Sequence, residues 1–126
     1  MEPDRNNNTA SAALTGPEKD FINSYQLQEA EVHRVAREKG WWENERNNGE
    51  AIALMHSELS EALEALRKGD PPDSKLPQFK SVEVELADVI IRIMDLAANR
   101  KWRIAEAIVA KSRFNKGREY RHGKAF

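Results

Sequence analysis

Residues 81–99 read SVEVELADVIIRIMDLAAN, and this stretch decides the fold. At about 100° per residue it forms a helix whose polar side chains mostly share one stripe about 80° wide. The stripe consists of Glu85, Asp88, Arg92, Asp95 and Asn99. An ordinary surface helix has a broad polar face. The apolar girth of this helix therefore predicts a central, buried position, with the acidic stripe facing other protein.

The segment before it, ALMHSELSEALEALR at residues 53–67, has the matching feature. Its predicted core stripe contains Ile52, Met55, Leu59, Leu63 and Leu66. Glu58 falls on the wheel among Ala51, Leu54, Ala62 and Ala65, and Glu61 lies at the edge of the same face. The small alanines leave space beside the carboxylate. Two helices are thus predicted to direct an acidic pair at one interior surface.

Four helices are predicted in all, over residues 21–39, 47–67, 81–98 and 102–115. Gly40 and the stretch KGDPPD end the first two helices, a short NRK turn separates the last two, and no segment alternates as a strand does. Short connections between amphipathic helices predict an all-α, four-helix bundle-like domain at residues 20–126. Residues 1–19 are predicted to be a disordered leader, and residues 116–126 a flexible basic tail.

Bulk composition narrows the class of protein. The chain has 126 residues, a formal net charge of −1 and no cysteine. These values suit one domain in a reducing cytoplasm, without disulfides or thiolate metal sites. No apolar run approaches a membrane span. The basic C-terminus raises the alternative of nucleic-acid binding, which is disfavoured because the patch is short and the rest of the chain offsets it.

The acidic pairs pose a charge problem. Four carboxylates meeting at an interior surface would repel and lose hydration, unless they are protonated or neutralised by a cation. Oxygen ligands without cysteine or clustered histidine favour Mg²⁺, with Mn²⁺ as a second choice, over Zn²⁺. The residues alone leave two alternatives open, which are pairing with basic side chains such as Arg92 and a solvated seam.

The sequence SELSEALEALRKG followed by EVELADVIIRIMDLA resembles the MazG-like nucleoside triphosphate pyrophosphohydrolases of the all-α NTP pyrophosphatase superfamily. The family pattern is Glu-x-x-Glu, a gap, then Glu-x-x-Asp. Here Glu58 and Glu61 are followed after 23 residues by Glu85 and Asp88. The resemblance extends over about residues 21–126. Members often carry a further Glu where this chain has Ser57.

The resemblance implies that Glu58, Glu61, Glu85 and Asp88 bind Mg²⁺. It also implies Mg²⁺-dependent hydrolysis of an NTP or dNTP to the nucleoside monophosphate and pyrophosphate. Among the four carboxylates, Glu61 is our candidate for the acceptor of the water proton. Relatives assemble as homodimers or homotetramers, which agrees with the excess apolar girth of residues 81–99. The alternative function is a non-catalytic helical adaptor whose acidic stripe pairs with a partner.

Substrate contacts are predicted at two further places. Lys111, Asn115 and Arg118 follow at i, i+4 and i+7, so they share a face if the last helix continues past Gly117. They are predicted to meet phosphate oxygens, the alternative being a solvated basic terminus. One of the adjacent tryptophans, assigned as Trp42, is predicted to stack on the base, although such pairs are more often core residues.

Overall fold

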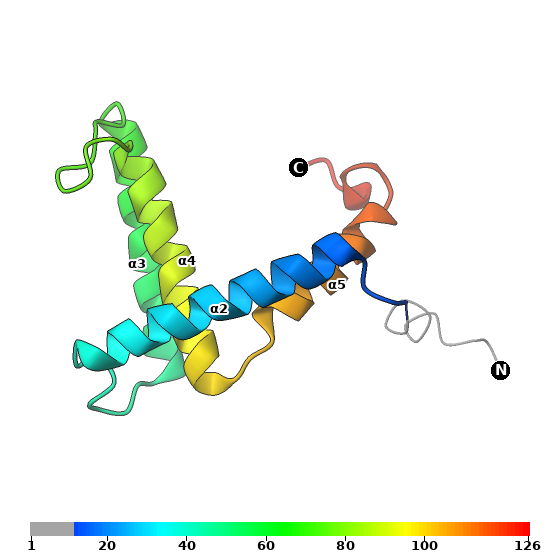
Figure 1. Cartoon of the computed structure of the whole chain (residues 1–126). Helices are drawn as coiled ribbons and strands as arrows, with labels where there is room; N and C mark the ends of the chain where they lie inside the picture. The colour runs from blue at the N-terminus through cyan, green and yellow to red at the C-terminus, as the bar shows by residue number, and fades with distance from the viewer. Residues whose placement is uncertain (1–11) are drawn as a thin grey trace. The chain divides into compact units, whose positions relative to one another are not determined.

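The computed structural model describes residues 12–126, and this part of the chain is all-α (Figure 1). Its elements are α2 (Gly16–Glu38), α3 (Asn48–Arg67), α4 (Ser81–Arg100), α5 (Ile104–Lys116) and the short 3-10 turn η1 (Tyr120–Gly123). In residues 12–126 no strand forms, and the loop before α4 contains one isolated bridge between Pro72 and Lys80. The all-α class and the four predicted helices are confirmed.

The helices fall into two compact units, which are described separately. The central unit is Gln28–Trp102 and contains the second half of α2 with α3 and α4. The terminal unit contains the first half of α2, to Leu27, together with residues 103–126. Among residues 12–126 no helix is long and apolar enough to cross a membrane.

The predicted start of α3 is confirmed, whereas α2 begins earlier than expected. The Asn47 side chain accepts a hydrogen bond from the Glu50 N–H at 3.1 Å and caps α3. At α2, Thr15 and Glu18 form a capping box: the Thr15 N–H donates to Glu18 Oε1 at 2.8 Å, and the Glu18 N–H donates to Thr15 Oγ1 at 3.2 Å. Residues 16–19 of the predicted leader are therefore helical, and residues 1–11 lie outside the described part.

In the central unit α3 and α4 lie side by side as an antiparallel pair (Figure 1). The buried face of α3 contains Ala51, Met55 and Ala62, and Ala51 and Met55 form a cluster with Leu96 of α4. Small side chains allow close approach of the helices and leave room for Glu58 on the same face.

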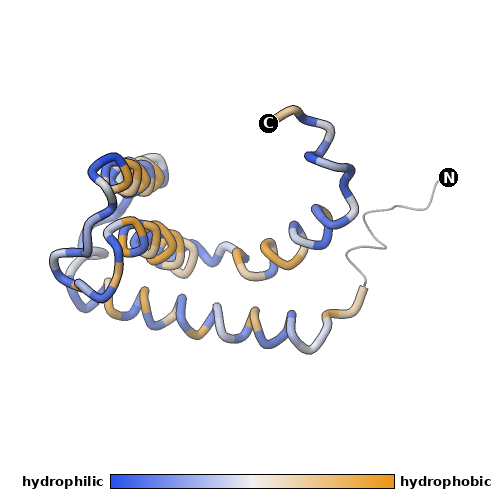
Figure 2. The backbone as a smooth tube through the Cα atoms, turned by 90° about the horizontal axis from the view of Figure 1, so that it is seen from above, coloured by the Kyte–Doolittle hydropathy of each residue, from blue (hydrophilic) through white to orange (hydrophobic). Residues whose placement is uncertain are grey.

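The predicted core stripe of α3 is wrong apart from Met55. Its other members, Ile52, Leu59, Leu63 and Leu66, are between 42% and 55% exposed. The alanine face is the one that packs, so the leucine face is left outward. Figure 2 shows hydrophobic residues recurring along both α3 and α4.

The predicted burial of α4 holds only for its C-terminal half. Met94, Asp95, Leu96 and Ala97 are buried. Leu86 and Ile90 in the N-terminal half, and Ile91 at the middle of the helix, are about half exposed. A single chain therefore leaves apolar surface on both helices of the α3–α4 pair.

The terminal unit is built on α5 and the start of α2. Ile22, Ala105 and Val109 form its buried cluster. Arg113 on α5 donates from Nε to Glu18 Oε2 at 2.8 Å, and this ion pair joins the two helices across their solvated edge.

Glu18→Gln tests this ion pair. Hydrogen bonds from Arg113, and then from the Thr15 backbone, hold the pKa of Glu18 at about 2, below its ordinary 4.5. Because the folded pKa is the lower one, the pair stabilises the fold above about pH 4.5 and loses this effect as the pH falls towards 2. In circular dichroism melts at neutral pH, E18Q should have a lower melting temperature than the wild type. On acidification, the melting temperature of E18Q should fall by less than that of the wild type. Equal acid dependence of the two proteins would contradict this.

Candidate metal centre and its cavity

Three of the four predicted metal ligands meet between α3 and α4. Glu58, Glu61 and Glu85 each offer one carboxylate oxygen, and these oxygens lie within 4.8 Å of one another. We call these residues the carboxylate cluster. The Glu58 side chain is only 14% exposed, whereas Glu61 is exposed to solvent. Oε2 of Glu85 is buried and has no hydrogen-bond partner.

The cluster perturbs the ionisation of its own members. Burial is the largest cause that raises the pKa of Glu85, to about 7, and the neighbouring carboxyl groups of Glu58 and Glu61 add to it. Burial also raises the pKa of Asp88, with the charge of Glu58 adding and Arg92 opposing. Like charges brought together away from water thus destabilise their own charged forms.

Asp88, the fourth predicted ligand, lies outside the carboxylate cluster. It follows Glu85 by one turn of α4 and lines a cavity next to the cluster. The structure therefore brings three predicted ligands together and places the fourth beside them.

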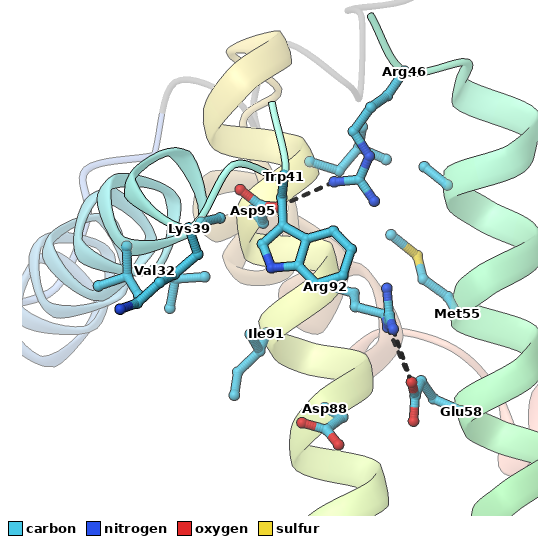
Figure 3. Close-up of a pocket in the computed structure, with 14 residues that line it drawn as sticks. Val32, Lys39, Trp41, Arg46, Met55, Glu58, Asp88, Ile91, Arg92 and Asp95 are labelled. Carbon is cyan, nitrogen blue, oxygen red and sulfur yellow. Dashed lines mark hydrogen bonds and ion pairs between the residues drawn. The ribbon is translucent and has the colours of Figure 1, made fainter. Parts of the chain in front are cut away.

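Arg92 neutralises one member of the cluster. Its Nη2 and Nε lie 3.0 Å and 3.2 Å from the same atom, Oε1 of Glu58 (Figure 3). Pairing with Arg92, which the sequence left open as an alternative, thus occurs at Glu58. It leaves the buried oxygen of Glu85 without a partner.

The cavity has a volume of about 310 Å³ and lies within the central unit. Apolar side chains of α2, α3 and α4, including Val32, Met55 and Ile91, form much of its wall. Its charged groups are Lys39, Arg46, Glu58, Asp88, Arg92 and Asp95. Figure 3 shows the indole of Trp41 between Arg46 and Arg92. A concave site that combines apolar walls with convergent polar groups is typical of a small-molecule site.

Trp41 and Trp42 have different environments. Trp41 is 68% exposed and lines the cavity. Trp42 is half-buried, and its indole N–H donates to Oδ1 of Asp95 at 2.8 Å. The guanidiniums of Arg46 and Arg100 lie 4.8 Å and 5.6 Å from the centre of the Trp42 ring. Trp42 thus anchors the loop that presents Trp41, and substrate contact by Trp42 stays a prediction.

Asp95 is the anchor that sequence reasoning missed. Its carboxylate accepts from the Trp42 N–H and from Arg46 at 3.3 Å, and His33 Nδ1 lies 2.8 Å away. The side chain is 11% exposed. A signal was present, because Asp95 stands inside the apolar run IMDLA. The residues that bind it come from distant segments, which periodicity does not connect.

Lys111 and Arg118 both lie against the ring of Phe114 in the terminal unit, and Asn115 follows Phe114 in the chain. Because α5 ends at Lys116, Arg118 lies beyond the helix, and helical continuation does not bring it to Lys111. Instead Lys111 Nζ and Arg118 Cζ lie 4.8 Å and 5.6 Å from the centre of the Phe114 ring. The Asn115 carbonyl accepts from the Arg118 N–H at 3.2 Å. Their role with phosphate stays a prediction.

Comparison of the chain with protein-family models, with curated proteins and with solved structures finds no match.

Glu85→Gln tests the electrostatics of the cluster. The folded pKa of about 7 lies above the ordinary 4.5. Without divalent cations, the contribution of Glu85 to the free energy of unfolding should therefore be largest below about pH 4.5 and fall as the pH rises through 7. We expect a fall of roughly 1–2 kcal/mol once solvent screening is included. E85Q, which carries no charge, should lose most of this fall and be more stable than the wild type at about pH 8.

Urea denaturation in the presence of a chelator measures this. Glu83→Gln is the matched control, because Glu83 lies on the same helix but is exposed. E83Q should follow the wild type. If E85Q is less stable than the wild type at about pH 8, the three carboxylates do not repel one another as described.

Proposed function

We propose that the carboxylate cluster binds Mg²⁺ and that the protein hydrolyses a nucleoside triphosphate to the monophosphate and pyrophosphate. The observation that carries this proposal is the grouping of three carboxylates with Glu85 Oε2 buried and unpartnered. A carboxylate oxygen away from water requires a proton or a cation. The Glu-x-x-Glu and Glu-x-x-Asp pattern, and its resemblance to the MazG-like enzymes, supply the reaction.

The donor set fits a hard divalent cation. Glu58, Glu61 and Glu85 offer only oxygen, and Asp88 stands one turn from Glu85. Mg²⁺ is bound in proteins by one or two carboxylates, waters and substrate phosphates, so an incomplete protein shell suits it. Mn²⁺ accepts the same ligands. When bound, Mg²⁺ would orient the phosphates, lower the pKa of water and neutralise the charge that develops.

The residues of the chain would then divide the remaining work. Glu61 is the exposed member of the cluster, and it is proposed to accept a proton from the attacking water. The water oxygen forms a bond to the α-phosphorus, and the bond from that phosphorus to the bridging oxygen breaks. Pyrophosphate leaves with the electron pair of that bond, so no protein nucleophile or redox partner is needed.

The cavity supports a nucleoside site. It adjoins Glu58 and Asp88, and Trp41 is the aromatic residue that lines it. We therefore propose that the base lies against Trp41, with Trp42 holding the loop in place. Lys111, Asn115 and Arg118 are proposed as phosphate-binding residues, because Lys111 and Arg118 both place a cation against the ring of Phe114 and Asn115 lies next to it in the chain.

Homodimers, or tetramers built from them, are proposed on the basis of the uncovered α3–α4 surface. Leu59, Leu63 and Ile90 are between 44% and 51% exposed on neighbouring helices. Exposed apolar rows of this kind are typical of protein interfaces. A second copy would cover them with the same surface.

Activity tests the proposed reaction. Incubation with Mg²⁺ and a panel of nucleoside triphosphates should release pyrophosphate and not orthophosphate. Glu58→Ala should lower turnover at least about a hundredfold, since a removed ligand affects both metal and substrate. Glu64→Gln is the matched control, because Glu64 is exposed on the same helix.

Failure has a defined form. If no nucleotide yields pyrophosphate and Mg²⁺ leaves the melting temperature unchanged, the enzyme proposal is wrong, and the adaptor alternative gains. Full activity of E58A would overturn the site assignment alone.

Leu63→Glu tests the assembly. The wild type should scatter light as a dimer or larger at micromolar concentration, whereas L63E should be smaller because it places a charge in the proposed interface. Leu27→Glu is the control, since Leu27 is 74% exposed and lies outside α3 and α4. A wild type that stays monomeric over a concentration series would contradict the proposal.

A further inference from the structure

Arg92 stands at the boundary between the carboxylate cluster and the cavity. Its guanidinium pairs with Glu58, a cluster member, and it lines the cavity together with Asp88 and Trp41. The Arg92 side chain is 37% exposed, whereas that of Glu58 is 14% exposed. The Arg92 side chain is thus more exposed to solvent than the carboxylate that it contacts.

The geometry of this pair favours its displacement. Both nitrogens of Arg92 approach the single oxygen Oε1 of Glu58, whereas the strong paired arrangement uses two carboxylate oxygens. Solvent around the partly exposed Arg92 side chain also weakens the pair. Arg46 differs from Arg92 in this respect. The carboxylate that Arg46 contacts, that of the buried Asp95, also accepts a hydrogen bond from Trp42 and is therefore held in place by a second residue.

The charge balance of the cluster points the same way. Arg92 offsets the charge of Glu58 only. The carboxylate oxygens of Glu61 and Glu85 lie within 4.8 Å of that of Glu58 and have no such partner among the ion pairs of the described residues. A divalent cation among the three carboxylates would supply two charges there. It would also repel a guanidinium that stays on Oε1 of Glu58.

We propose that Arg92 is an internal counter-cation that occupies Glu58 until a divalent cation replaces it, and that the released guanidinium then holds a phosphate group of the nucleotide in the cavity. The inference rests on the proposed function. Arg92 would bind two anions in succession, first the carboxylate of Glu58 and then a phosphate group. Arginine suits both, since its planar fork matches either group.

The proposal makes opposite predictions for the two ligands. Arg92→Gln removes the competitor at Glu58, so Mn²⁺ alone should bind roughly three- to tenfold more tightly than to the wild type. With saturating Mg²⁺, inorganic triphosphate should bind R92Q roughly tenfold more weakly, because one charged contact is lost. Arg92→Lys keeps the charge without the fork and should fall between the two proteins for both ligands.

The experiment is a pair of calorimetric titrations on the full chain, Mn²⁺ without nucleotide and triphosphate with Mg²⁺. Arg34→Gln is the matched control. Arg34 pairs with Glu31 and Glu38 on the exposed surface of α2 and does not line the cavity, so R34Q should match the wild type. Circular dichroism establishes that each variant is folded.

Each outcome decides a separate question. If the wild type binds no Mn²⁺, the proposed metal site fails, and the role of Arg92 fails with it. If the wild type binds Mn²⁺ and R92Q binds it no more tightly, the counter-cation role is overturned while the metal site stands. If Mn²⁺ binding tightens but triphosphate binding is unchanged, the phosphate role of Arg92 is overturned.

Discussion

The structure depends on the gathering of negative charge at the face where α3 meets α4. Glu58, Glu61 and Glu85 share a small volume, and one oxygen of Glu85 is shut off from water and from hydrogen-bond donors. Carboxylates so placed remain charged only if a cation offsets them. Near neutral pH, a proton on Glu85, the guanidinium of Arg92 and a divalent ion are alternative ways to offset that charge. On the proposed function, competition among these three would make the ionisation of this face depend on pH and on divalent cations.

The way in which α3 packs links this face to the exposed surface of the chain. Ala51 and Ala62 point inward, so the two helices approach closely with Glu58 between them. The same orientation turns Leu59 and Leu63 outward. A helix with leucines inward would have built a larger core in one chain but would have moved Glu58 from its place beside Glu85. The exposed leucines and the carboxylate cluster thus follow from one choice of packing face.

Much of this could be predicted from the sequence. Breakers and caps such as Asn47 and Gly69 marked the helix ends, and the spacing of Glu58 and Glu61 marked one face of α3. The choice between the leucine and alanine faces could not be made, because a hydrophobic pattern ranks side chains by apolarity and takes no account of how closely two backbones approach. The sequence also did not predict that only half of α4 is buried, because an apolar pattern does not say how many neighbouring helices pack against it.

Contacts between segments that are far apart in the chain could not be predicted from the periodicity of the sequence either. Asp95 binds Trp42 and Arg46 from a loop some fifty positions earlier in the chain. Arg118 and Lys111 both contact the ring of Phe114, although the helix ends between them. Such arrangements depend on loop geometry, whereas periodicity describes only the inside of a helix. The early start of α2 differs, because the capping box of Thr15 and Glu18 is local and its spacing could be read from the sequence.

The most direct test is anomalous diffraction from crystals grown with Mn²⁺. The proposed cation site predicts a strong anomalous peak among the carboxylates of Glu58, Glu61 and Glu85, with Glu58 turned away from Arg92. A map without that peak at saturating Mn²⁺, in which Arg92 still pairs with Glu58, would contradict it.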